Sequence, residues 1–225
     1  MKKLAIKYSL EIIVIILGIS ISFYMEKQNA LSYKEDLKNQ SLRRVLKNIE
    51  VDQNDFKFNK KANQQAIHSG RWLYQRKDSL ENYSKDSIGY HLTMAIFCNT
   101  IFVDNQEEYR GLQNSGLIEL IENEEVVERL QKKYTIHEFL KKIEGYINQE
   151  GILQEYYIYN TTRSKEMDIF MGYVVPSTMR HKNIEPHIME KLALKGELHK
   201  FYLNLVDGQL RRDSVLVKLI QEEIK

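Results

Sequence analysis

Proline, the residue that most reliably interrupts a helix, is absent from the first 175 residues of this chain. The only two prolines are Pro176 and Pro186, and ten glycines are spread thinly over 225 residues. A proline blocks a helical hydrogen bond, and strand-rich domains need many turn residues. This composition therefore favours long helices, and we expect an all-α fold.

Apolar residues at helical spacing predict where these helices lie. The spacing predicts one long amphipathic helix over about 26–76, which can continue an apolar segment before it. Asp86 or Ser87 can cap a helix through 88–99, and Asn114-Ser115-Gly116 resembles a helix end with Gly116 in a left-handed cap. Asn123 resembles the start of a helix that reaches about Tyr159, and a final helix is weakened at Asp207-Gly208. We expect an antiparallel bundle of four to five helices over 26–225.

Residues 8–25 form an apolar run of membrane-spanning length. The run is 18 residues long and contains one ionisable side chain, Glu11. A helix that crosses a bilayer needs about 20 mostly apolar residues, in a range of about 17–25. A cleaved signal peptide is the rival interpretation, but no small-x-small cleavage site follows the run. We interpret 8–25 as an uncleaved transmembrane signal anchor.

The anchor divides the chain into three parts: a cytoplasmic stub at 1–7, the membrane helix at 8–25 and an extracytoplasmic helical domain at 26–225. Basic residues lie on both sides of the run, so local charge counting does not fix its orientation. The stub is too short to form a domain, which favours keeping it in the cytoplasm. We expect a single-pass protein of the cytoplasmic (inner) membrane, with its domain in the periplasm.

Glu11 belongs to a stripe of residues on one helix face, together with Lys7, Gly18 and Ser22. Two interpretations remain open. Glu11 can sit near the headgroups and pair with Lys7. Alternatively, the stripe packs against a partner helix, because Gly18 and Ser22 permit close approach and Glu11 can bond across the interface.

The charge distribution argues against nucleic-acid binding. The chain contains 33 Lys and Arg against 31 Asp and Glu. The first 25 residues hold three of these bases and one of the acids, so the remaining charges cancel. A nucleic-acid-binding domain usually has a clear basic excess. Cys98 is the only cysteine, so the cysteine count does not assign a redox compartment.

Motifs of known chemistry are missing from the sequence. There is no H-E-x-x-H, no phosphate-binding glycine loop and no G-x-S-x-G stretch. The nearest metal-like cluster is His181, Glu185, His187 and Glu190, which we interpret as a solvated loop and a helix start. We therefore expect neither an enzyme nor a bound cofactor or metal.

Two segments resemble an uncharacterised family of single-pass membrane proteins of Bacteroidota with a helical domain of unknown function. The first is "LEIIVIILGISISFYMEKQ", although Leu10 stands where the family tends to have Gly. The second is "IFVDNQEEYRGLQNSGLIELIENEEVVERLQKKY". Its matching positions are Phe102, Tyr109, Leu112, Ser115, Gly116, Leu120, Ile121, Asn123 and Tyr134. The resemblance implies a membrane-anchored helical protein and implies no activity.

These observations favour a membrane-anchored helical interaction or scaffolding protein of the bacterial cell envelope. Its expected partners are the lipid bilayer and a protein, or a second copy of the chain, bound through the membrane helix. The alternative is an extracytoplasmic bundle that senses a small ligand and signals through a membrane partner.

Overall fold

The computed structural model describes residues 2–149, 151–162 and 177–224, with side chains from residue 10 onward. Its elements are α1 (Lys2–Gln75), η1 (Leu80–Asn82), α2 (Lys85–Phe97), α3 (Glu107–Asn114), η2 (Leu117–Leu120), α4 (Glu124–Asn148), α5 (Gly151–Asn160), β1 (Thr161–Thr162), β2 (Thr178–Met179) and α6 (Pro186–Glu223). The two short strands pair antiparallel, with Thr161 opposite Met179. The prediction of an all-α fold is confirmed.

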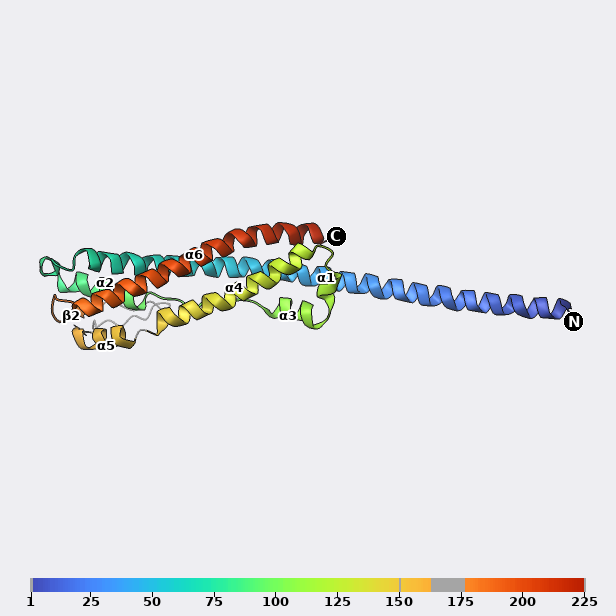
Figure 1. Ribbon diagram of the computed structural model, residues 1–225, viewed down its shortest axis with the longest axis horizontal. Helices are drawn as coiled ribbons and strands as arrows, with labels where there is room; N and C mark the ends of the chain where they lie inside the picture. The colour runs from blue at the N-terminus through green and yellow to red at the C-terminus, as the bar shows by residue number, and fades with distance from the viewer. Residues whose placement is uncertain (1, 150, 163–176, 225) are drawn as a thin grey trace.

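The helices form an elongated antiparallel bundle from which one end of α1 projects (Figure 1). We call the end where α1 leaves the bundle the near end, and the opposite end the far end. α1 runs to the far end, and α2, an extended segment and α3 return. α4 and α5 then run outward again, and α6 returns to the near end beside α1. The predicted bundle is therefore present, but one of its legs is only partly helical.

The projecting part of α1 is solvent-exposed at every residue from 10 to 36. Burial begins at Lys38, and from there the residues that face the bundle follow alternating steps of four and three: Lys38, Leu42, Val45, Ile49, Asp52, Phe56, Asn59, Asn63 and Ala66. This spacing is typical of helices that pack side by side. The prediction of a long helix that continues the apolar segment is confirmed, because α1 is unbroken from Lys2 to Gln75.

The structure does not support the prediction of a transmembrane helix at 8–25. Among the residues that are described, no helix combines the length and the apolar character needed to cross a membrane. The side chains of residues 1–9, which include the predicted stub and the start of the predicted span, lie outside the described part of the chain.

Three apolar clusters fill the bundle from end to end. The near cluster includes Leu42, Leu112 and Leu216, and the middle cluster is built around Phe56, Phe102 and Tyr202. The far cluster contains Leu73, Leu92 and Leu192 together with residues of α5. Charged and polar side chains, among them Lys38, Asp52 and Asp213, are buried in the bundle as well.

The structure corrects three predicted helix boundaries, in α2, α4 and α6. α2 is capped by Ser84, whose hydroxyl accepts from the Ser87 N–H, and not by Asp86 or Ser87 themselves. α4 ends at Asn148, so the predicted helix to Tyr159 is two helices. α6 passes through Asp207-Gly208 without a break, because its neighbours α1 and α4 support it there.

Two predicted helix ends are confirmed. Gly116 follows α3 with a φ of 70°, the left-handed conformation that glycine adopts at no steric cost. Asn123 caps α4, and its side-chain oxygen accepts from the Glu125 N–H at 3.0 Å.

Candidate functional site: a buried polar network and its cleft

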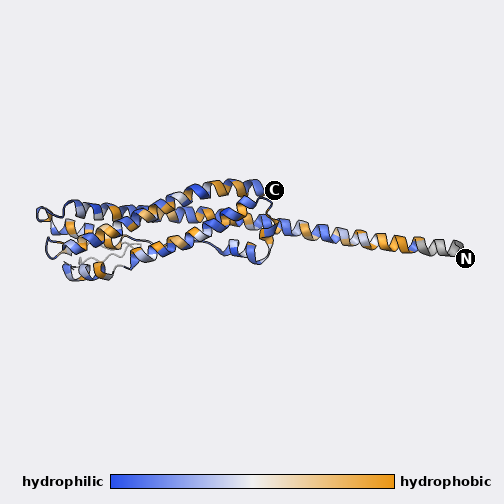
Figure 2. Ribbon diagram, in the orientation of Figure 1, coloured by the Kyte–Doolittle hydropathy of each residue, from blue (hydrophilic) through white to orange (hydrophobic). Residues whose placement is uncertain are grey.

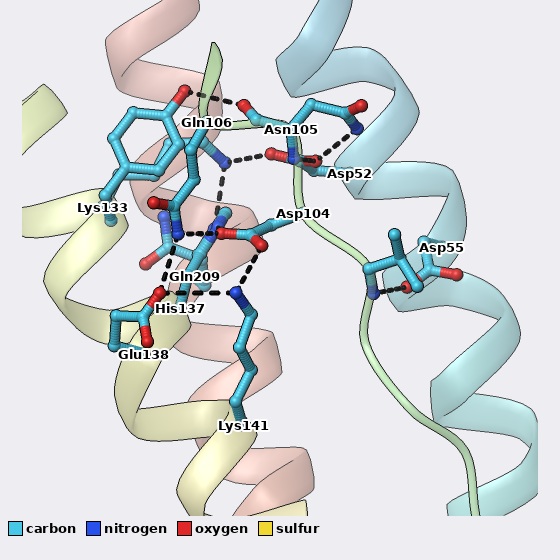
Figure 3. A network of polar contacts seen from close by, with 12 residues as sticks. Asp52, Asp55, Asp104, Asn105, Gln106, Lys133, His137, Glu138, Lys141 and Gln209 are labelled. Carbon is cyan, nitrogen blue, oxygen red and sulfur yellow. Dashed lines mark hydrogen bonds and ion pairs between the residues drawn. The ribbon is translucent and has the colours of Figure 1, made fainter. Parts of the chain in front are cut away.

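The extended segment between α2 and α3 explains why acids are buried in this bundle. Residues 99–106 are not helical, so their backbone N–H groups need acceptors other than helical carbonyl groups. The Phe102 N–H donates to both carboxylate oxygens of Glu144, at 2.9 and 3.0 Å. The Val103 N–H donates to Asp55, and the Asn105 N–H donates to Asp52 at 3.2 Å (Figure 3). These acids therefore replace the missing helical partners.

Lys133 of α4 lies at the centre of the largest group of these side chains (Figure 3). Its Nζ is 3.0 Å from Asp52 Oδ2 on α1 and 3.3 Å from Asp213 Oδ2 on α6. It also lies 3.1 Å from His137 Nε2. Lys133 thus makes hydrogen bonds to His137 and Asp213 and an ion pair with Asp52, and the lysine is 1% exposed.

His137 connects Lys133 to a second ion pair. An ammonium group can only donate and a carboxylate can only accept, so the His137 ring accepts from Lys133 at Nε2. Its Nδ1 then donates to Asp104, 3.3 Å away. Burial lowers the pKa of His137, and the hydrogen bond to Asp104 opposes this lowering only in part. Asp104 also pairs with Lys141 at 2.6 Å.

The pKa values of two carboxyl groups in this network shift in opposite directions. Burial raises the pKa of Asp104, but hydrogen bonds from His137, Lys141 and Gln106 outweigh it and leave the pKa well below its ordinary value. Burial raises the pKa of Asp213, and Lys133 and Gln209 offset this only in part. With both of its acids ionised, the group of Lys133, Asp52 and Asp213 carries one net negative charge inside the bundle.

Two further polar contacts hold α6 against α1. At the near end, Lys38 Nζ lies 3.0 Å from Glu223, which also accepts from the backbone N–H groups of Glu122 and Asn123. Toward the far end, His199 Nδ1 lies 2.6 Å from Asn63 Oδ1. Burial and the nearby Lys195 lower the pKa of His199 to about 3.

A cleft between α4 and α6 reaches this network from the surface. It has a volume of about 180 Å³. The residues that line it are Glu125, Glu128, Arg129, Lys132, Lys133, Gln209, Arg212, Asp213 and Leu216. Its floor includes Lys133 and Asp213, which are 1% and 0% exposed, so a molecule in the cleft would lie over the buried ion pair.

The predicted membrane stripe lies on the projecting part of α1. Glu11, Gly18 and Ser22 are exposed, and a side chain at Gly18 would meet no atom within 4 Å. The Ser22 hydroxyl donates to the Gly18 carbonyl at 3.0 Å within the helix. The side chain of Lys7 lies outside the described residues, so its pairing with Glu11 stays a prediction.

The residues that resemble the membrane-protein family are brought together mainly at the near end. Phe102, Tyr109, Leu112, Ile121 and Tyr134 are buried, and the rings of Tyr109 and Tyr134 stack at 4.5 Å. Ser115, Gly116 and Asn123 form helix ends, and the Leu120 carbonyl accepts from Lys38. In the structure these residues pack the core, cap helices and, at Leu120, bind Lys38 where α1 leaves the bundle.

Sequence reasoning missed the polar network altogether. Lys38, Asp52 and Asn63 occupy core-facing positions of α1, where apolar residues are expected. A polar residue at such a position is the signal that could have identified them. In the described residues, no group of three or more His, Cys, Asp and Glu could hold a metal ion.

Comparisons with protein-family models, with curated proteins and with solved structures find no match to this chain. The resemblance to the Bacteroidota membrane family is not tested by these comparisons and stays a prediction.

Proposed function

We propose that this protein is a membrane-anchored helical interaction module of the bacterial cell envelope. In this proposal, the apolar N-terminal part of α1 inserts into the cytoplasmic membrane, and the bundle acts as a rigid platform outside the cell interior. The module acts by binding other proteins rather than by catalysis.

One observation carries the proposal: the apolar side chains at the projecting end of α1 have no partner surface in the bundle. The large hydrophobic residues from Leu10 to Met25 are between 51% and 67% exposed. Hydrophobic colour gathers at this end of the helix (Figure 2). Soluble proteins rarely leave so long an apolar surface uncovered, and a bilayer covers it on all sides.

The polar part of the projecting helix supports the same arrangement. Residues 26–36 are exposed and mostly polar, and they separate the apolar segment from the first buried residue, Lys38. At about 1.5 Å per residue, they would hold the bundle roughly 15–20 Å from the membrane. Such a spacer leaves the sides of the bundle open to partner proteins.

Membrane fractionation of full-length protein tests the proposal. The wild-type chain is expected to remain in the pellet after extraction with alkaline carbonate. Replacing Ile15 and Ile16 together by Glu is expected to move the protein to the soluble fraction. Each charge near the centre of a membrane helix costs about 2.5–3.5 kcal/mol on insertion scales.

A matched control places the same charges in the spacer. The pair Leu31→Glu and Tyr33→Glu changes two exposed residues of the same helix, outside the apolar segment. This variant is expected to stay in the membrane fraction. A wild-type chain that carbonate fully releases would overturn the proposal.

A small-ligand sensor is the second candidate, and the cleft between α4 and α6 favours it. The floor of the cleft includes Lys133, which contacts Asp52 on α1. A ligand that altered this contact would act on the helix that leads to the proposed membrane segment.

A further inference from the structure

The cleft between α4 and α6 has walls built from facing helix surfaces. The α4 wall comes from positions 125, 128, 129, 132 and 133, and the α6 wall from 209, 212, 213 and 216. Residues three and four apart share one helix face, so each wall is a single continuous surface. The cleft is therefore a regular feature of how the two helices pack.

Charged groups of both signs stand at the rim of the cleft. Arg129 is paired with Glu125 through its Nε and one terminal nitrogen, at 2.8 and 2.6 Å. Arg212 uses its Nε to donate to Gln209, and its two terminal nitrogens have no partner in the described structure. Lys132 and Glu128 likewise make no ion pair or hydrogen bond with the described residues. The rim thus offers two cations and one acid for new contacts.

The floor of the cleft adds buried polar groups that are fixed in place. Asp213 is 0% exposed, and each of its carboxylate oxygens accepts one hydrogen bond, from Gln209 and Lys133. A carboxylate oxygen can accept two, so Asp213 retains capacity to accept further hydrogen bonds. With Asp52 and Asp213 both ionised, the group around Lys133 carries one net negative charge, which favours a positively charged group at this depth.

The size of the cleft restricts what it can hold. Its volume is about 180 Å³. A protein cavity of about 150 Å³ holds a molecule as large as benzene. A ligand of roughly six to ten non-hydrogen atoms therefore fits.

We propose that this cleft binds a small zwitterion of the free α-amino acid type. The ammonium group of the ligand lies toward Asp213 and Glu128, and its carboxylate lies toward Arg212 and Lys132. A simple anion would use only the rim cations and would face the negative floor. A simple cation would use the floor but would face Arg212 and Lys132. This inference does not depend on membrane attachment.

Isothermal titration calorimetry on the full-length protein tests this assignment. The probes are L-alanine, L-serine, L-aspartate, L-glutamate and L-lysine, with acetate and methylammonium as ligands of a single charge. At least one amino acid is expected to bind at least about tenfold more tightly than either single-charge ligand. Binding of none of the amino acids overturns the proposal, and so does equally tight binding of acetate.

Variants of the rim separate a specific site from weak surface binding. Arg212→Leu and Glu128→Gln are each expected to weaken binding of the best amino acid by about tenfold or more. Arg211→Leu, at the exposed position next to Arg212, is the matched control and is expected to leave binding unchanged. Glu128 is exposed, so its variant keeps the fold even if Arg212→Leu does not. Unchanged binding in Glu128→Gln would overturn the proposal.

Discussion

Lys133 Nζ lies 3.0 Å from Asp52 Oδ2, and the two side chains, 1% and 0% exposed, join α4 to α1 inside the bundle. The same lysine contacts Asp213 on α6. Sliding any of these helices past its neighbours would separate buried charges, which is costly in a desolvated interior. We infer that this contact fixes the helices in one register.

Replacing Lys133 by Met tests the energetic role of this contact. The variant leaves Asp52 and Asp213 buried without their cation. The free energy of unfolding is expected to fall by about 3–5 kcal/mol, the usual result of breaking a buried ion pair. Urea denaturation followed by circular dichroism measures this change.

Two further variants control for the change of side chain. Lys132→Met, at the exposed neighbouring position, is expected to alter the free energy of unfolding by less than about 0.5 kcal/mol. The triple variant Asp52→Asn, Lys133→Met and Asp213→Asn is expected to recover part of the lost stability. If Lys133→Met were as mild as Lys132→Met, the structural role of the network would be refuted.

Acid should weaken the bundle through His199. Burial and Lys195 lower its pKa from 6.5 to about 3 in the folded state. Between these values the unfolded chain binds more protons, so the free energy of unfolding falls as the pH falls from about 6.5 to about 3. The contribution of one such group is about 1.4 kcal/mol per pH unit.

The comparison of two histidine variants isolates this contribution. His199→Gln removes the titrating ring, so the stability advantage of the wild type over this variant is expected to shrink steadily below pH 6.5. His187→Gln changes an exposed ring and should follow the wild type in parallel. Parallel pH profiles for wild type and His199→Gln would contradict the assignment.

Gly89 is required where α2 meets the segment before β2. A Cβ atom at this position would lie 1.8 Å from the Ser177 carbonyl oxygen, so the backbone must move. Gly89→Ala is expected to lower the free energy of unfolding by about 1–3 kcal/mol.

Gly145 provides the matched control. A Cβ atom at Gly145, within α4, would meet nothing within 4 Å. Gly145→Ala should therefore raise the free energy of unfolding by up to about 1 kcal/mol. Thermal denaturation compares the two, and equal effects would refute the close approach at Gly89.

Glu223 holds the start of α4 against the end of α6. Its carboxylate accepts from Lys38 and from the N–H groups of Glu122 and Asn123. Glu223→Ala is expected to speed amide hydrogen exchange at 122 and 123, because these donors lose their acceptor. Glu222→Ala, at an exposed neighbouring position, should leave both rates unchanged. Equal exchange rates in wild type and Glu223→Ala would show that the carboxylate does not hold this end.

The sequence predicts the helices better than the polar contacts between them. Apolar periodicity and capping residues are local properties of the sequence. They correctly indicate the long helix α1 and the helix ends at Gly116 and Asn123. The sequence does not reveal which groups accept from the backbone N–H groups of residues 99–106, because these are acids distant in the chain, such as Glu144. It also predicts a weakened helix at Asp207-Gly208, whereas α6 is unbroken there. Packing against two neighbouring helices overrides the local propensity of glycine.

The candidate site also depends on contacts between residues that are distant in the sequence. Lys133 and Asp213 look like ordinary surface charges in the sequence, and only the pairing of α4 with α6 places both in one cleft. In contrast, the apolar segment at the start of α1 is visible in the sequence alone, and the structure adds that its large side chains are exposed.

The central claim is membrane insertion of α1, and site-directed fluorescence tests it most directly. In full-length protein with Cys98→Ser, a polarity-sensitive dye is attached to a single cysteine at Leu17 or at Tyr33, and the protein is added to liposomes. The account predicts blue-shifted emission at position 17, quenched by bromine-labelled lipid chains, and water-like emission at position 33. Water-like, unquenched emission at both positions would contradict it.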